Sequence, residues 1–341
     1  NSGRWPVIST VCLFFNVLDM LNTITRPIEK EMAMFNSYFE SQFKSDLPLL
    51  DSALRYVNEG TGKKMRPILL LLVAKYLGNL NIKMLASASA MEMLHTASLL
   101  HDDVIDESDK RRGRPSVNVA YNNSIAVLVG DYILSQSLNN AATTRDYRIV
   151  EELSILGKAL TRGELMQLDL QRNGSYSEEN YISVIKYKTA SLFVCCCACA
   201  VYSADADTEM LERFKKFGEN IGICFQIKDD LFDYYSNDVG KPTGSDMREG
   251  KITLPALYVL ENSNNPMLEP IRAKLSASQF LDENEIGQLI RISIEEGGIG
   301  YAENMIERYR SEALALLPDD ISDELREALT AYIDYVIKRD K

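Results

Sequence analysis

Two acidic clusters with the same spacing are the residues best suited to chemistry in this chain. They are Asp102-Asp103-Val104-Ile105-Asp106 and Asp229-Asp230-Leu231-Phe232-Asp233, and each lies inside an apolar helical pattern. Residues three and four apart are neighbours on an α-helix, so each cluster gathers carboxylates on one face, where their repulsion destabilises the helix. A cation is therefore expected beside them. Mg²⁺ is the natural candidate, because it takes oxygen ligands and usually binds one or two carboxylates together with substrate phosphates.

Basic residues stand near both clusters in the sequence. Arg111 and Arg112 follow the first cluster, and Lys241 and Lys251 follow the second. Further upstream, Gly62-Lys63-Lys64-Met65-Arg66-Pro67 leads into a helix. Carboxylates that bind Mg²⁺, combined with Lys and Arg, are typical of diphosphate sites, since Arg binds phosphate oxygens as a fork and Lys as a point charge.

Two such clusters indicate a diphosphate that is bound tightly enough to act as a leaving group in a reaction. Ionisation of an allylic diphosphate yields a carbocation and inorganic diphosphate, and metal ions neutralise the charge that builds on the leaving group. The surrounding wall must be apolar and dry, because water would capture the cation. Apolar helices that carry Asp clusters at one end satisfy this demand.

From about residue 24 to the C-terminus, the chain resembles the trans-isoprenyl diphosphate synthases of the long-chain type, also called polyprenyl synthetases. The motifs that carry the resemblance are, in chain order, Gly-Lys-Lys-Met-Arg-Pro at 62–67, His95, Leu-Leu-His-Asp-Asp-Val-Ile-Asp at 99–106, Arg111-Arg112-Gly113, Gly163-Glu164 with Gln167, Lys188-Thr189, Phe225-Gln226 before the second cluster, Gly240-Lys241-Pro242, and Gly250-Lys251. Their order along the chain is specific to that family.

The resemblance implies a reaction and its partners. An allylic diphosphate would ionise, condense with isopentenyl diphosphate and lose a proton to the departing diphosphate. Mg²⁺ would assist, with three ions present when diphosphate is bound. The resemblance also implies a homodimer.

The resemblance further assigns roles to individual residues. The Mg²⁺ ligands would be Asp102, Asp106 and Asp229, supported by Asp103, Asp230 and Asp233. Contacts to the allylic substrate would come from Arg111, Lys188, Thr189, Gln226 and Lys241, with Lys251 in the leaving-group pocket. The isopentenyl diphosphate site would use Lys63, Arg66, His95 and Arg112. The residues expected to act in catalysis are Asp102, Asp103, Asp106, Arg111, Lys188, Asp229 and Asp230.

Small residues before the first cluster predict a long product. Ala97 and Ser98 lie one turn before Asp102, where short-chain relatives usually place an aromatic floor. Leu94 and Met91 follow deeper on the same face. One helical turn rises about 5.4 Å, similar to one extended isoprene unit. We therefore expect a product of about C30–C50, with octaprenyl as the central estimate, while the primer stays open.

The elements that must position these residues are helices. Residues 20–341 are interpreted as one all-α domain, a large helical bundle with a central apolar cavity capped by the two Asp clusters, and residues 1–19 as a disordered or non-native extension. Strand signals are nearly absent, and several helices are apolar over most of their circumference, which is typical of the interior of a bundle. The expected helices span 24–44, 47–59, 66–77, 82–107, 117–142, 147–172, 178–203, 207–236, 253–262, 282–297, 299–316 and 320–338. Gly78, Gly113 and Asn173-Gly174 are interpreted as helix stops, and Ser177 as the start of a helix.

Composition narrows the function further. A net charge of −12 over 341 residues argues against nucleic acid as a partner. The six cysteines are not spaced as a disulfide framework and are interpreted as reduced core residues of a cytoplasmic protein. No run of about eighteen apolar residues indicates a membrane span, so at most transient contact with a membrane surface is expected, through a lipid-like product.

Other functions were weighed against this one. A di-iron bundle needs Glu-x-x-His twice, and the residue three before His101 is Ser98. A P-loop needs Ser or Thr after the lysine, and Lys64 follows Lys63. A shorter-chain farnesyl or geranylgeranyl diphosphate synthase, a class I terpene cyclase and a non-catalytic subunit stay open as alternatives, although the doubled cluster and the basic residues favour the long-chain synthase.

Overall fold

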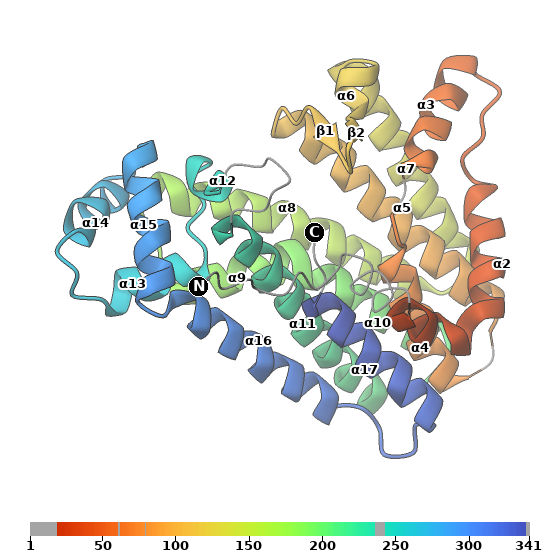
Figure 1. The fold of residues 1–341 in the computed structure, drawn as a ribbon. Coiled ribbons are helices and arrows are strands. Elements are labelled where there is room, and N and C mark those ends of the chain that lie inside the picture. Colours follow the sequence, from red (N-terminus) through yellow and green to blue (C-terminus); the bar gives the residue numbers. More distant parts are fainter. Residues whose placement is uncertain (1–18, 61, 79, 236–242, 339–341) are drawn as a thin grey trace, which may run out of the picture.

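The computed structural model describes residues 19–60, 62–78, 80–235 and 243–338, and this part is predominantly helical (Figure 1). Within these residues, the strands are β1 (Lys110–Arg111) and β2 (Arg114–Pro115), which pair as one short antiparallel hairpin. The α-helices are α2 (Glu29–Glu40), α3 (Pro48–Glu59), α4 (Met65–Leu77), α5 (Ile82–Ile105), α6 (Val117–Ala120), α7 (Asn123–Thr143), α8 (Tyr147–Asn173), α9 (Glu178–Ile185), α10 (Ser191–Ser203), α11 (Thr208–Leu231), α12 (Ser245–Arg248), α13 (Leu254–Asn262), α14 (Leu268–Ser276), α15 (Glu283–Glu295), α16 (Gly298–Ala315) and α17 (Asp323–Lys338). The expected all-α bundle is confirmed, while the predicted extension lies outside the described residues except for Asp19, which is helical.

The central helices are those without a polar face. In α4 every residue from Pro67 to Ala74 is buried, and in α10 nearly every residue is buried. Such helices must lie inside the bundle, because at the surface of the protein any orientation would expose some of their apolar side chains to water. Small side chains on α5 let α7 pack closely along it, and the Ser137 hydroxyl donates to the Ala90 carbonyl at 2.7 Å.

Helix α11 joins two hydrophobic cores. Its first half contributes Phe214, Phe217 and Ile221 to the larger core, which is formed mainly by the N-terminal half of the chain and α17. Its second half contributes Ile227 and Leu231 to a smaller core with α13, α15 and α16. The second acidic cluster therefore lies at the end of a helix that is anchored on both sides.

Helices α9 and α10 run as one continuous helix through a π-helical turn, η2 (Lys186–Ala190). By length and composition alone, Glu178–Ser203 could cross a membrane, which the sequence analysis had not recognised. In the fold, 72% of its most apolar window is buried. Its hydropathy is therefore accounted for by its place in the core.

Several helix ends follow the predicted signals. The Ser177 hydroxyl caps α9 by accepting from the Asn180 amide at 3.2 Å, and α8 ends before Gly174, which has φ +59°. Helix α4 ends before Gly78. These ends depend on local hydrogen bonds and backbone freedom, which is why the sequence alone predicts them.

Other boundaries differ from the expectation. The predicted helix 117–142 is divided into α6 and α7, because Asn122 caps a new helix through the Ile125 amide at 2.9 Å. Gly113, interpreted as a helix stop, instead lies in the β1–β2 turn with φ +78°. Helix α11 ends at Leu231 in a 3₁₀ turn, and α14 follows Pro266 without having been predicted.

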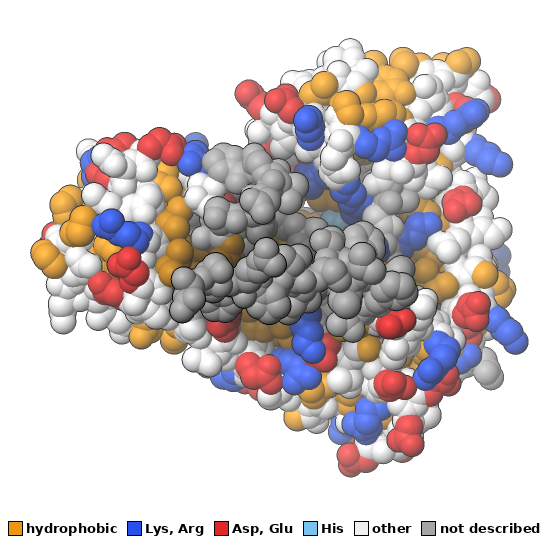
Figure 2. Space-filling view, in the orientation of Figure 1, with side chains coloured by type: hydrophobic (Ala, Val, Ile, Leu, Met, Phe, Trp, Pro, Cys, Tyr) orange, Lys and Arg blue, Asp and Glu red, His pale blue; other side chains and the backbone are white. Residues whose placement is uncertain are grey.

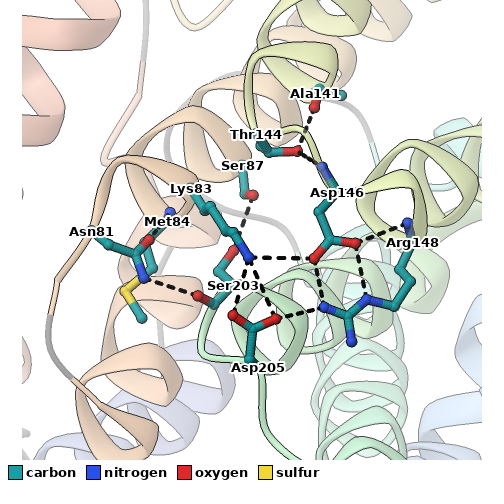
Figure 3. Close-up of polar contacts among 10 residues, drawn as sticks. All are labelled: Asn81, Lys83, Met84, Ser87, Ala141, Thr144, Asp146, Arg148, Ser203 and Asp205. Carbon is teal, nitrogen blue, oxygen red and sulfur yellow. Dashed lines mark hydrogen bonds and ion pairs between the residues drawn. The ribbon is translucent and has the colours of Figure 1, made fainter.

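An ionic network centred on the buried Asp146 ties three helix junctions at the end of α5 remote from the first acidic cluster (Figure 3). Asp146 caps α8, accepts a fork from Arg148 at 2.6 and 2.9 Å, and lies 3.6 Å from the Lys83 ammonium. Arg148 and Lys83 both reach Asp205, at 2.7 and 3.1 Å. This network holds the start of α5 against the α7–α8 and α10–α11 turns.

Candidate functional site

The two acidic clusters lie at the C-terminal ends of α5 and α11 and face one cavity, called here the acidic cavity. Asp102 and Asp106 contribute from the first cluster, and Asp229 and Asp230 from the second. A helix C-terminus carries partial negative charge from its unpaired carbonyls, which adds to the carboxylates. The cavity therefore has a strong requirement for cations.

The protonation behaviour of these carboxyl groups expresses the same requirement. Burial, followed by the charge of Glu164, raises the pKa of Asp102 to about 6. Burial and the charge of Asp246 raise the pKa of Asp230 well above its ordinary value. A raised carboxyl pKa means that ionisation is costly in the surroundings given. A bound cation would reverse that cost.

The supporting carboxylates are fixed by hydrogen bonds. Arg111 donates to Asp103 through Nε and Nη2, at 3.0 and 2.5 Å to one oxygen. Asp230 accepts from the Tyr181 hydroxyl at 2.6 Å and from the Gln226 amide at 2.7 Å. These three donors come from the β1–β2 hairpin, α9 and α11, so the carboxylates also tie the walls of the cavity together.

Asp233 lies differently from its neighbours. It accepts from the Ser245 amide and hydroxyl, both at 2.9 Å, and from the Asp246 amide at 3.0 Å. Both of its oxygens are thus engaged in capping α12. Asp233, the third carboxylate of the second cluster, thus holds the start of α12 in place, and the chain continues from there to the acidic cavity.

Basic and polar side chains complete the acidic cavity. Lys188 bonds Glu164 at 2.6 Å, and Lys251 bonds Glu249 at 2.5 Å. The Thr189 hydroxyl donates to Gln226 at 2.5 Å. The residues predicted for the allylic substrate that line this cavity are Arg111, Lys188, Thr189, Gln226 and Lys251. Lys241 falls outside the described residues.

The π-helical turn brings Lys188 and Thr189 to the cavity. Gly163 on α8 lies so close that a Cβ there would be 2.8 Å from the Lys188 amide nitrogen. Gly222 on α11 lies on another side of the turn, where a Cβ would be 2.4 Å from the Ala190 Cα. Widened turns of this kind are frequent at functional sites. Here two glycines make room for the turn.

A second cavity, called here the basic pocket, adjoins the first and shares Leu99 and Arg111 with it. It is lined by His95, Arg112 and Arg114, with apolar side chains of α3, α5 and α6 around them. Burial lowers the pKa of His95 well below its ordinary value, and the charges of Arg66 and Arg112 lower it further. His95 is therefore neutral, and its Nδ1 has no hydrogen-bond partner.

The remaining predicted residues of the second substrate lie beside the basic pocket. The Arg66 guanidinium stacks over Phe193 and Phe225, at 5.6 and 5.9 Å from the ring centres. Lys63 is exposed and donates to the Tyr335 hydroxyl on α17. Neither of them lines the basic pocket or the acidic cavity.

The predicted product-length residues follow α5 away from the first cluster. Ala97, Leu94 and Met91 are buried, and Ser98 is half-buried with its hydroxyl on the His95 carbonyl at 2.9 Å. This face ends in a contact to α10, where Ser87 and Ser203 are hydrogen-bonded at 3.2 Å (Figure 3).

Sequence reasoning missed Asp246 and Tyr181. Burial and the charge of Asp233 raise the pKa of Asp246 to about 6, and the residue lines the acidic cavity. No spacing relates it to either Asp cluster, although it lies between Gly240-Lys241 and Gly250-Lys251. Tyr181 resembles any tyrosine on an apolar helix until α9 is placed beside α11.

The donor set fits a hard divalent cation that arrives with an anionic substrate. Five carboxylates line the acidic cavity, yet no three acidic, His or Cys side chains among the described residues are close enough to enclose an ion by themselves. Mg²⁺ keeps several waters and binds through one or two carboxylates plus phosphates, so it needs no closed cage. In the space-filling view, Arg and Lys side chains lie along the upper and right margin of the central recess (Figure 2), where they would favour an anionic substrate.

Comparison with known proteins agrees with this geometry. The sequence model of the family described as Polyprenyl synthetase matches residues 47–292. An octaprenyl diphosphate synthase of Haemophilus influenzae is 32% identical, over 91% of this chain and 94% of its own. The geranylgeranyl pyrophosphate synthase structure from Bacteroides thetaiotaomicron is 41% identical, covers 94% of this chain and all of its own, and has a TM-score of 0.80. A Caulobacter crescentus polyprenyl synthase, complexed with calcium and isoprenyl diphosphate, has a TM-score of 0.85 at 28% identity, with 94% and 98% covered.

We predict that Gly163→Ala weakens both the fold and the site. The added methyl meets the Lys188 backbone, and overpacking of this kind costs about 1–3 kcal/mol in the free energy of unfolding. Gly157→Ala on the same helix is the control, because nothing lies within 4 Å of its Cβ position, and it should stabilise by about 0.5–1 kcal/mol. Urea unfolding measures both; equal effects of the two substitutions would contradict the tight contact.

Proposed function

Because the chain belongs to the polyprenyl synthetase family and is a prenyltransferase, we propose that it condenses an allylic diphosphate with successive isopentenyl diphosphates. One observation carries the proposal. The acidic cavity, which suits a metal-bound diphosphate, shares Leu99 and Arg111 with the basic pocket, which suits a second diphosphate without metal. A reaction that joins two diphosphate esters needs two such sites side by side.

In the acidic cavity, the chain would bind and ionise the allylic substrate. Asp102, Asp106 and Asp229 would hold Mg²⁺ against the diphosphate, and the metal supplies neutralisation of the leaving group when bound. Lys188 and Arg111 would bind the same phosphate oxygens directly, Lys188 as a point charge and Arg111 as a fork. Asp103 orients Arg111 for this role through the hydrogen bonds given above.

In the basic pocket, the second substrate would be oriented for attack. Arg112 and the neutral His95 would bind its diphosphate by charge and by hydrogen bonding, and Arg66, which lies beside the pocket, would add to the positive charge. The shared wall at Leu99 is apolar, so water is kept from the carbocation where the two chains meet. The departing diphosphate would accept the proton, and no side-chain base is required.

We predict that the purified protein elongates farnesyl diphosphate with isopentenyl diphosphate when Mg²⁺ is present. Chelation should abolish turnover and added Mg²⁺ should restore it. Asp102→Asn should lower kcat at least about 10²-fold, since metal stabilisation of the leaving group contributes several kcal/mol. A cyclic hydrocarbon product would support a terpene cyclase, and absence of turnover would support a non-catalytic subunit; either result would refute the proposal.

The length of the product is a finer proposal. The Haemophilus relative is named for an octaprenyl product and the Bacteroides structure for a geranylgeranyl product, so similarity alone does not decide between them. The residues that face away from the first cluster on α5 are small or flexible at Ala97, Ser98 and Met91. We propose that the growing chain extends along this face to about C30–C50.

We predict that Ser98→Tyr shortens the product, because an aromatic ring one turn before Asp102 would block the path. Ala97→Tyr should act in the same direction, with a greater loss of stability because Ala97 is buried. Ser98→Ala is the control and should leave product length unchanged. Chromatography of the dephosphorylated products measures the lengths, and unchanged products in both tyrosine variants would remove this account.

We predict that the chain forms a homodimer through α7 and α8. Large apolar side chains are exposed on these helices, at Leu128, Leu138, Ile155, Leu165 and Leu168. Sedimentation equilibrium should give twice the chain mass of 38.4 kDa. Leu128→Asp should shift the protein to monomer, whereas Ile294→Asp, at an exposed position on α15, should leave the dimer intact; a monomeric wild type would contradict the prediction.

A further inference from the structure

Glu92 is a buried acid that the proposed reaction does not use. It lies on α5, one turn before His95, and only 4% of it is exposed. Its Oε2 has no hydrogen-bond partner, and the residue lines the basic pocket. An unpaired carboxylate is costly inside a protein, so its presence in this wall calls for an explanation.

Three cations act on Glu92 and offset part of the cost of its burial. Burial raises the pKa of Glu92, and the charges of Arg66, Arg112 and Lys64 oppose that rise. Lys64 is already engaged elsewhere, because its ammonium bonds Asn36 at 2.8 Å. Arg66 and Arg112 are thus the cations left to balance Glu92, with Arg112 in the pocket and Arg66 beside it.

The two guanidinium groups come from separate segments and repel each other. Arg66 belongs to the first turn of α4, and Arg112 to the β1–β2 hairpin turn. Burial has the largest effect on the pKa of Arg112 and lowers it. The charge of Glu92 opposes this decrease, whereas the charges of Arg66 and Arg111 add to it. The Arg112 guanidinium also donates to the Gly60 carbonyl at 2.9 Å, and it lies where a side chain on residue 62 would be, in space left free by Gly62.

At the other end of this face of α5, a second acid and arginine are already hydrogen-bonded to each other. Glu92, Thr96, Leu99 and Asp103 follow one stripe of α5 along the basic pocket. At one end of the stripe, Asp103 holds Arg111 by two hydrogen bonds to one oxygen. At the other end, Glu92 Oε2, Arg66 Nε and His95 Nδ1 are all buried and unpaired. Two of these atoms belong to residues that line the basic pocket, and the third belongs to Arg66, whose charge acts on both residues. Unpaired polar atoms on residues related in this way indicate that the arrangement completes its bonds with a ligand.

We propose that Glu92 is a positioning residue, whose carboxylate holds Arg66 and Arg112 together so that they bind the diphosphate of the second substrate. Glu92 lies one turn further from the acidic cavity than His95 does, so it attracts the guanidinium groups from behind. Without it, the two cations separate and the pocket loses its diphosphate geometry. This inference rests on the proposed function only for the identity of the substrate.

Titration calorimetry with inorganic diphosphate, in buffer containing EDTA, tests the proposal without turnover. Without metal the acidic cavity repels the anion, and Arg112→Ala identifies the binding that belongs to the basic pocket. Glu92→Gln should raise that Kd at least tenfold, and Glu92→Asp, which keeps the charge, should recover part of the loss. Glu152→Gln is the matched control, since Glu152 is a buried glutamate on α8 that pairs with Lys215, and it should leave the Kd unchanged.

Kinetics supplies the readout that a merely structural role would not give. In Glu92→Gln the KM for isopentenyl diphosphate should rise at least tenfold, while the KM for the allylic substrate stays within twofold. Equal or tighter diphosphate binding by Glu92→Gln overturns the proposal, as does a wild type that binds none. If Glu92→Gln does not fold, Glu92→Met decides, because it removes the charge without leaving an unpaired polar group in the wall; a Kd equal to wild type in that variant overturns the proposal. If the wild type shows no turnover, the proposed function is refuted, but the calorimetry still tests whether Glu92 positions the two arginines.

Discussion

Repulsion between carboxylates at the ends of two buried helices is the constraint on which the rest of the structure depends. Helices α5 and α11 each end in an acidic cluster, and both ends carry the partial negative charge of their terminal carbonyls. The raised pKa of Asp102 and of Asp230 shows that ionising these buried, neighbouring carboxyl groups is unfavourable. The surrounding fold must therefore hold together what electrostatics would separate, until cations and a substrate arrive.

Packing supplies the opposing force. Helix α11 is anchored in two hydrophobic cores, and α5 is packed along α7 and fastened at its far end by the network of Lys83, Asp146 and Asp205. Hydrogen bonds within the site add to this, because Asp230 is held from α9 and Asp233 from α12. Carboxylates held this rigidly cannot relax apart, and this preorganisation is what makes electrostatic catalysis effective.

The same logic separates the two diphosphate sites. The acidic cavity has an excess of carboxylates and would attract metal, whereas the basic pocket has an excess of guanidinium groups and needs none. Arg111 belongs to both walls and is neutralised by Asp103. Each cavity would thus take a different form of the same chemical group, and the apolar Leu99 lies in the wall that the two cavities share.

Local chemistry made much of this predictable from the chain alone. The acidic clusters, the caps at Ser177 and Gly174 and the long apolar helices each depend on residues a few positions apart, which a helix brings together by its own hydrogen bonds. Asp246, Tyr181, the π-helical turn and the two-sided role of Arg111 were not predictable in this way. They depend on segments far apart in the chain meeting at one cavity, and such meetings are determined by how large apolar faces pack, for which no short spacing in the sequence is a signal.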